Sequence, residues 1–190
     1  WIGTYSGGLN RVDKSGQKVE VFKNEPGNSN SLSANQILDI YIESENKIWI
    51  ATFGGGLNKL SFSDNTSGIP EITTYKNNPS NPNSLSDDRV YTILRDSKNN
   101  FWVGTYGGGL NKFDEQTGSF KVFFPDPKYI QSKLSAKILS IYESSDGLIW
   151  IGTSGDGLNQ FNPKTNTFKN FSLAQGLTSA VVYGILEDNK

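Results

Sequence analysis

The residues that most often perform acid–base or nucleophilic chemistry are sparse in this sequence. It contains no His and no Cys, which removes the commonest general base, a common metal ligand and all thiol chemistry. An enzyme would have to rely on paired carboxylates, as glycosidases do. Asp87 and Asp88 are adjacent, but they lie in a predicted loop and have no recurring partner. We therefore predict no catalytic residues and expect that the protein is not an enzyme.

The spacing of the acidic and glycine residues disfavours two further kinds of site. Asp96 and Asp146 fall in separate predicted turns, so the carboxylates do not cluster as metal ligands and we predict no metal. The run Gly107-Gly108-Gly109 suggests a phosphate-binding loop. However, the Lys-Ser/Thr pair of a P-loop does not follow the run, and the G-x-G-x-x-G pattern of a dinucleotide-binding turn does not precede a predicted helix. Such runs are typical of tight turns, because glycine reaches positive φ without steric cost. No cofactor is predicted.

The glycine runs belong to a stretch that occurs four times and begins with a tryptophan each time. The copies start at Trp1, Trp49, Trp102 and Trp150. Exposed tryptophans could stack on sugars, but a fixed place in every copy is more typical of a core between repeated units. The threonine three residues after each tryptophan is expected to satisfy backbone or neighbouring-unit hydrogen bonds.

Each repeat predicts four short strands, in the order apolar strand, Trp strand, Leu-Asn strand and outer strand. The apolar run Ile37 to Glu43 favours a strand that is buried on both faces. Four such strands in about fifty residues are typical of a β-propeller blade. We predict an all-β β-propeller of four-stranded antiparallel blades, with residues 1–190 forming a single domain or segment. Its repeat units are 1–48, 49–101, 102–149 and 150–190.

The number of blades in the ring stays open from sequence. The chain could close as a four-bladed ring or form part of a seven- or eight-bladed propeller. Val181 to Glu187 predicts one more apolar strand, which we expect to pair with Trp1 to Tyr5 in this chain or in a second copy. Either pairing would remove exposed sheet edges, and the second would make a homo-oligomer that completes a larger propeller. The sequence lacks Met and opens inside a repeat, so we expect an excerpt of a longer polypeptide.

The repeats resemble a known family, the two-component regulator propeller repeat. The general form of that repeat is I-x-x-I-x-E-D-x-x-G-x-x-W-I-G-T-x-x-G-G-L-N. Residues Ile138 to Asn159 match this form nearly throughout. Ala51 replaces one glycine and Asp156 interrupts one glycine run. The resemblance implies a periplasmic or extracellular sensor propeller of a bacterial hybrid histidine kinase, a group often concerned with polysaccharide utilisation. In that family two seven-bladed propellers usually precede an immunoglobulin-like domain, a membrane helix and the kinase.

Candidate ligand-binding residues lie at the predicted mouth of the ring channel. The turns after the Trp strands place three aromatic residues there, namely Tyr5, Phe53 and Tyr106. The positions just before the apolar strands supply Gln36, Arg89 and Lys137. Aromatic, amide and cationic groups around a mouth suit an oligosaccharide by stacking and hydrogen bonding. Ordinary loop variation is the alternative interpretation.

Charge and hydropathy narrow the remaining partners. The net charge of −1 argues against the basic face that nucleic-acid binding needs. The sequence has no apolar run of about 18 residues, so we predict no membrane contact by this segment. We predict an extracytoplasmic ligand-sensing or interaction module that binds a glycan or another small ligand. A structural scaffold for protein–protein contacts is the alternative, and a propeller lyase or glycosidase is less favoured.

Overall fold

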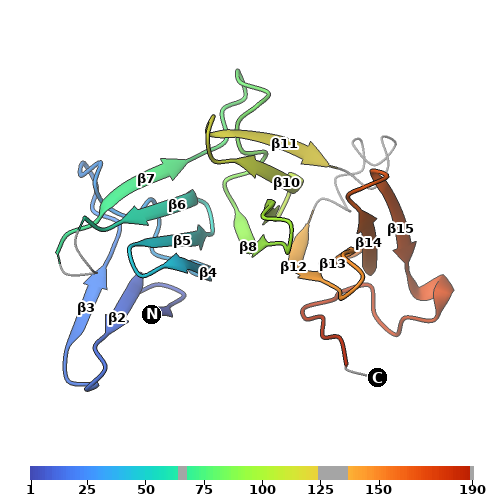
Figure 1. The fold of residues 1–190 in the computed structure, drawn as a ribbon, viewed down its shortest axis with the longest axis horizontal. Coiled ribbons are helices and arrows are strands. Elements are labelled where there is room, and N and C mark those ends of the chain that lie inside the picture. The colour runs from blue at the N-terminus through green and yellow to red at the C-terminus, as the bar shows by residue number, and fades with distance from the viewer. Residues whose placement is uncertain (64–67, 124–136, 189–190) are drawn as a thin grey trace.

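The four repeats form four twisted antiparallel sheets that stand side by side along an arc (Figure 1). A computed structural model describes residues 1–63, 68–123 and 137–188. The first sheet has three strands and each of the others has four, joined in chain order as meanders. The predicted all-β propeller architecture with antiparallel blades is confirmed. The apolar strands β4, β8 and β12 lie innermost and contact one another in sequence.

The strand bounds follow the predicted order in every sheet. The first sheet contains β1 (Ile2–Gly3), β2 (Leu9–Val12) and β3 (Val19–Phe22). The second contains β4 (Ile37–Ser44), β5 (Lys47–Thr52), β6 (Gly56–Ser61) and β7 (Glu71–Tyr75). The third contains β8 (Val90–Arg95), β9 (Phe101–Thr105), β10 (Gly109–Asp114) and β11 (Ser119–Phe123). The fourth contains β12 (Ile138–Glu143), β13 (Ile149–Thr153), β14 (Leu158–Asn162) and β15 (Thr167–Phe171).

Large aromatic side chains fill the space between neighbouring sheets. Trp49 is fully buried against Phe101 and Phe113 of the third sheet, with ring centroids 4.8 and 5.5 Å away. Trp102 packs edge-on against Phe161 of the fourth sheet at 5.7 Å. The interpretation of the tryptophans as core between blades is therefore confirmed. Sheets diverge towards their outer strands, and bulky rings fill this wedge where small side chains would leave voids.

The indole nitrogens are satisfied by the hairpin turns at the other end of the sheets. Nε1 of Trp49 donates to Glu43 at 2.7 Å, and Nε1 of Trp102 donates to Asp96 at 2.9 Å. Nε1 of Trp150 donates to the hydroxyl of Ser144 at 3.0 Å. In these three repeats a residue at or beside the hairpin turn and the tryptophan thus act together, because a buried indole N–H needs an acceptor.

The chain does not close into a four-bladed ring, and that predicted arrangement is wrong. Val181 to Glu187 forms no strand and does not pair with β1, which bonds only to β2. The segment instead lies beside the fourth sheet, in the position that an innermost strand takes after each of the other sheets. The amide of Val182 donates to Thr153 and Glu187 accepts from Ser145, as Glu143 accepts from Ser97. Four sheets separated by aromatic wedges turn through only part of a circle (Figure 1). Pairing with a second copy stays a prediction.

Long loops cover the outer edges of two sheets. The loop that leaves the first sheet brings the Asn30 side chain to β7, where it accepts from the Ile72 amide at 2.8 Å and donates to the Pro70 carbonyl. The loop that leaves the second sheet brings the Asn83 carbonyl to the Phe120 amide of β11 at 2.7 Å. These three edge backbone groups, which could otherwise pair with another chain, are therefore bonded within this one.

Helical structure is slight in the part of the chain that the structure describes. The 3-10 helix η2 (Leu173–Gln175) follows β15 and is closed by a capping box between Ser172 and Gln175. Among the described residues no helix has the length and apolar character to cross a membrane.

Candidate ligand-binding site

The predicted mouth residues form one continuous row of backbone contacts. The amide of Phe53 donates to the Gln36 carbonyl at 3.0 Å, and Phe53 also forms an antiparallel bridge with Arg89 of the next sheet. The amide of Tyr106 donates to the Arg89 carbonyl at 2.8 Å, and Tyr106 bridges to Lys137 in the same way. Each turn residue therefore lies between its own innermost strand and that of the following sheet.

Tyr106 is the centre of this row. Its ring centroid lies 6.1 Å from that of Phe53 and 6.0 Å from that of Tyr91, which stacks on it at an interplanar angle of 28°. The guanidinium of Arg89 and the ammonium of Lys137 lie 5.7 and 5.5 Å from the same centroid. Both distances are within the range of cation–π attraction. Four of the predicted residues thus meet at one aromatic ring.

Tyr5 and Gln36 lie farther along the same face. Tyr5 is 75% exposed, and it is near enough to Tyr91 to contribute to that residue's raised pKa. Gln36 joins the row through its backbone carbonyl. The structure therefore places all six predicted residues on one face, and it gathers Phe53, Arg89, Tyr106 and Lys137 most closely.

The charges at the mouth are unequally compensated. Arg89 is held by Asp87, with Nε 2.8 Å from Oδ1 and Nη2 2.5 Å from Oδ2. This pair raises the pKa of Arg89 above its ordinary value, although partial burial opposes the shift. Within the described ranges Lys137 has no carboxylate partner. The Arg89 fork is thus fixed in place and Lys137 supplies the net positive charge.

Tyr91 enters the site although the sequence did not point to it. It is the second residue of β8 and is half-buried. Burial raises its pKa first, and the neighbouring phenols Tyr183, Tyr106 and Tyr5 add to the shift, so the hydroxyl stays protonated and can donate. We expected the innermost strands to be buried on both faces, but β4 is buried only at Ile37, and β8 is only partly covered at Tyr91 and at its last two residues. The apolar run in the sequence does not distinguish Tyr91 from its neighbours.

A buried polar clamp holds each turn in place beneath the site. The hydroxyl of Thr105 donates to the Gly109 carbonyl at 3.0 Å, and the Asn111 amide donates to the Ser86 hydroxyl at 2.8 Å. Thr52 with Gly56, and Asn58 with Ser33, repeat the arrangement in the second sheet at 2.8 and 2.6 Å. The predicted role of the threonines is therefore confirmed. The buried clamps position the loops that carry the mouth residues.

The turn also requires glycine at its last position. Gly56 has φ of 82°, a region that L side chains rarely adopt. A Cβ there would overlap the carbonyl oxygen of Tyr75. The same residue therefore allows the backbone to turn and allows the outer strand to come close.

Three segments of the chain match the family model described as two component regulator propeller, over residues 31–54, 84–107 and 132–155. Each match includes an innermost strand, a Trp strand and the start of the following turn. These segments are two component regulator propeller repeats. The mouth residues Gln36, Phe53, Arg89, Tyr106 and Lys137 all lie within these repeats.

Comparison with known proteins places the repeats in a larger context. Histidine kinase P4 of Formosa agariphila is 33% identical over 92 residues, which cover 46% of this chain and 6% of the kinase. The extracellular domain assigned to one hybrid two component system of B. thetaiotaomicron is 27% identical, with a TM-score of 0.75 over 90% of this chain and 23% of that chain. A second such domain from the same organism is 23% identical, with a TM-score of 0.65 over 87% of this chain and 22% of that chain. This second likeness shows the fold alone. The chain therefore spans less than a quarter of each of these relatives.

Proposed function

We propose that the chain is a ligand-sensing module of a hybrid two-component system and acts in the periplasm or outside the cell. Support comes from the propeller repeats and from the similarity to extracellular domains of such systems. A partial match to a histidine kinase points the same way. In this proposal the propeller binds the signal and performs no chemistry, which agrees with a sequence that has no His and no Cys.

The ligand we propose is an oligosaccharide bound at the mouth around Tyr106. The carrying observation is the convergence of two aromatic rings and two cations on the Tyr106 ring. Aromatic faces stack on the apolar faces of sugars, while amide, guanidinium and ammonium groups donate to sugar hydroxyls. Arg89 is preorganised by Asp87, so its fork loses little freedom on binding.

The experiment is a glycan-array screen of the 190-residue chain, followed by calorimetric titration of the glycan that binds best. Tyr106→Ala should weaken binding about tenfold, because aromatic contacts contribute on the order of 0.5–1.5 kcal/mol beyond the apolar area that they bury. Ser154→Ala is the matched control, since Ser154 holds the same turn position in the fourth sheet and bridges to Val181. Binding that survives Tyr106→Ala unchanged would contradict the site, and a blank array would contradict the glycan.

A further inference from the structure

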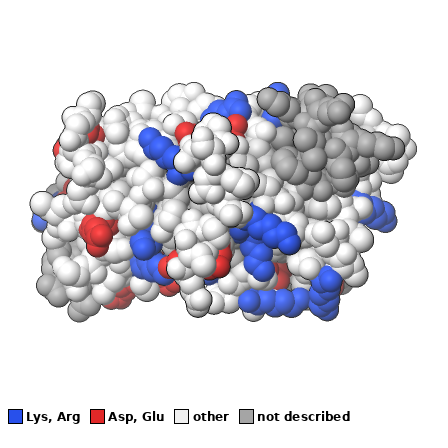
Figure 2. Space-filling view, turned by 90° about the horizontal axis from the view of Figure 1, so that it is seen from above, with Lys and Arg blue, Asp and Glu red and all other residues white. Residues whose placement is uncertain are grey.

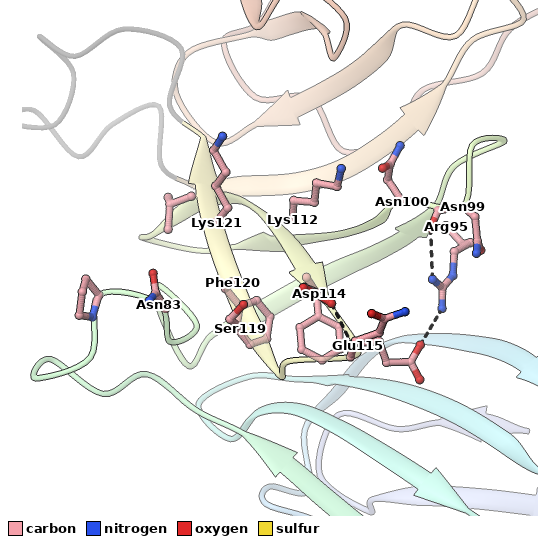
Figure 3. Close-up of a pocket in the computed structure, with 14 residues that line it drawn as sticks. Asn83, Arg95, Asn99, Asn100, Lys112, Asp114, Glu115, Ser119, Phe120 and Lys121 are labelled. Atoms are coloured by element: carbon pink, nitrogen blue, oxygen red, sulfur yellow. Dashed lines mark hydrogen bonds and ion pairs between the residues drawn. The ribbon is translucent and has the colours of Figure 1, made fainter.

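An open cleft of about 990 Å³ lies on the outer part of the third sheet (Figure 3), and none of the mouth residues lines it. Strands β10 and β11 form its floor, the turn between them forms one end, and two polar segments border it. Amide side chains dominate the border, from Asn83, Asn99, Asn100 and Gln116. The aromatic rings that reach the cleft, Phe113 and Phe120, are each only 4% exposed. The cleft therefore offers hydrogen-bonding groups and charge, and little aromatic surface for stacking.

Two lysines stand directly opposite each other on this floor. Lys112 of β10 and Lys121 of β11 are partners in the strand register, and their side chains leave the hairpin on the same side (Figure 3). Like charges in this relation destabilise a sheet. Lys112 lies 5.8 Å from the Trp102 ring and Lys121 lies 5.1 Å from the Phe123 ring, so both ammonium groups are held beside aromatic faces.

The other three sheets avoid this arrangement at the same register position. The first sheet pairs Arg11 with Glu20, which form an ion pair. The second pairs Lys59 with Thr73, and the fourth pairs Gln160 with Lys169. Only the third sheet places two cations opposite each other. Its repulsive pair is therefore a local departure from the repeat and coincides with the cleft.

The carboxylates near the cleft are engaged elsewhere. Glu115 pairs with Arg95 at 3.3 Å and with Lys47. Asp114 accepts from the Gln116 amide at 2.9 Å, and its pKa is lowered by hydrogen bonds from Thr117 and Gln116, with a smaller contribution from Lys112. Over the described ranges neither Lys112 nor Lys121 forms an ion pair. The face seen in Figure 2 carries positive and negative side chains interspersed.

We propose that the cleft is a second binding site, which takes the carboxylate or sulfate groups of an acidic oligosaccharide between Lys112 and Lys121. An oxyanion there would convert the repulsion into two charge-assisted hydrogen bonds. The bordering amides would donate to and accept from the hydroxyls of the sugar. Because exposed aromatic faces are scarce in the cleft, a neutral sugar gains little, and the charge selects the ligand. The site is separate from Tyr106 and does not depend on the function proposed for the mouth.

The first test compares tri-galacturonic acid with neutral maltotriose, and with inorganic sulfate, by calorimetric titration of the 190-residue chain at low salt. We expect tri-galacturonic acid to bind, maltotriose not to bind at this site, and added salt to weaken binding through screening. Lys112→Gln and Lys121→Gln should each reduce affinity about tenfold, as the loss of a charge-assisted hydrogen bond predicts. Tyr106→Ala should leave this affinity unchanged, which separates the cleft from the mouth.

Lys59→Gln is the matched control for the lysine variants. Lys59 holds the position of Lys112 in the second sheet and lies 6.0 Å from the Trp49 ring, but it faces Thr73 and does not line the cleft. Its substitution should leave affinity unchanged. The proposal is overturned if neither tri-galacturonic acid nor sulfate binds, if maltotriose competes equally, or if Lys59→Gln weakens binding as much as the cleft variants.

A second test measures what the lysine pair costs the free chain in thermal stability. Lys121→Glu recreates in the third sheet the Arg11–Glu20 arrangement of the first. It should raise the Tm of the free chain and abolish binding of tri-galacturonic acid. Lys169→Glu, opposite the neutral Gln160, should raise the Tm less. A Lys121→Glu variant that melts below the parent would show that the lysine pair costs no stability, and would remove the reason for a ligand there.

Discussion

A Cβ atom added to Gly104 would lie 2.6 Å from Cγ2 of Ile138, the first residue of the next innermost strand. Gly3 meets Ile37 at the same 2.6 Å. In the second sheet the equivalent residue is Ala51, and the strand that follows begins with the smaller Val90. Ala51 and Val90 belong to one buried cluster. The glycine of the Trp strand is therefore a packing position, which leaves room for the side chain that begins the next innermost strand.

Gly104→Ala should destabilise the chain by about 1–3 kcal/mol, the usual cost of overpacking a core. Adding Ile138→Val should recover little of the loss, because valine keeps the Cγ2 methyl group that the new Cβ would meet, and Cγ2 of Thr92 would still lie 2.8 Å from that Cβ. Urea unfolding followed by tryptophan fluorescence measures both. Ala51→Gly is the reciprocal control and should cost less than Gly104→Ala. A loss of less than about 1 kcal/mol for Gly104→Ala would contradict the overpacking explanation.

Trp102→Ala should lower the free energy of unfolding by about 3–5 kcal/mol, as expected for truncating a large buried aromatic residue. Trp102 is 1% exposed and contacts Phe123 and Phe161. Trp150→Ala should cost less, since Trp150 is only partly buried and stacks on Phe171 of its own sheet. Equal losses for the two variants would show that contacts between sheets do not dominate.

The repeated motif allowed the blades to be predicted, because strand order, turn glycines and core tryptophans recur in register. The mouth followed from the same register, which placed Phe53, Arg89, Tyr106 and Lys137 at equivalent positions. Tyr91 was missed because an apolar run does not reveal which alternate residue faces the channel. The Lys112–Lys121 pair was missed because cross-strand register depends on the geometry of the turn between β10 and β11, which the repeat pattern alone does not specify. The four-bladed alternative failed because the angle between sheets depends on the volume of packed rings such as Trp49 and Phe101.

Acidification should weaken a network of ion pairs between the second and third sheets. Glu43 accepts from Trp49 and pairs with Lys47 and Arg95, at 3.0 and 2.9 Å. Burial raises the pKa of Glu43, but the hydrogen bonds and cations outweigh it and hold the pKa below the ordinary 4.5. Its stabilising contribution is therefore complete above pH 4.5 and is lost as the pH falls through the depressed value.

The measurement for this network is the Tm as a function of pH. Glu43→Gln should melt below the parent at neutral pH, and the difference should shrink as the pH falls below the ordinary carboxyl range. Glu45→Gln, at an exposed position of the same turn, should follow the parent at every pH. A constant gap between Glu43→Gln and the parent down to strongly acidic pH would contradict the linkage.

Asn30→Ala should promote association of the chain more than it lowers stability. The side chain satisfies Ile72 and Pro70 at the outer edge of β7, and its loss costs about 1 kcal/mol as a typical hydrogen bond. The edge groups then become available to another molecule. Light scattering during incubation below the Tm reports the association. Asn10→Ala is the control, since Asn10 makes one long, exposed hydrogen bond to Ile2. Equal scattering from both variants would argue against edge protection.

The edge-covering loops have a direction. Asn30, which bonds to the outer edge of β7, lies in the loop that leaves the preceding sheet. Asn83, which bonds to the outer edge of β11, likewise lies in the loop that leaves the sheet before it. During synthesis the N-terminal sheets emerge first, so each new outer strand would meet a cover that is already in place. In a nascent chain the partners of the Ile72 and Phe120 amides would then be synthesised before the strands that carry these amides, whereas a chain refolding from denaturant could form the sheets in any order. Translation itself would thus protect this molecule from misassembly, and circular permutants that place Asn30 or Asn83 after the strand it covers would lose that protection.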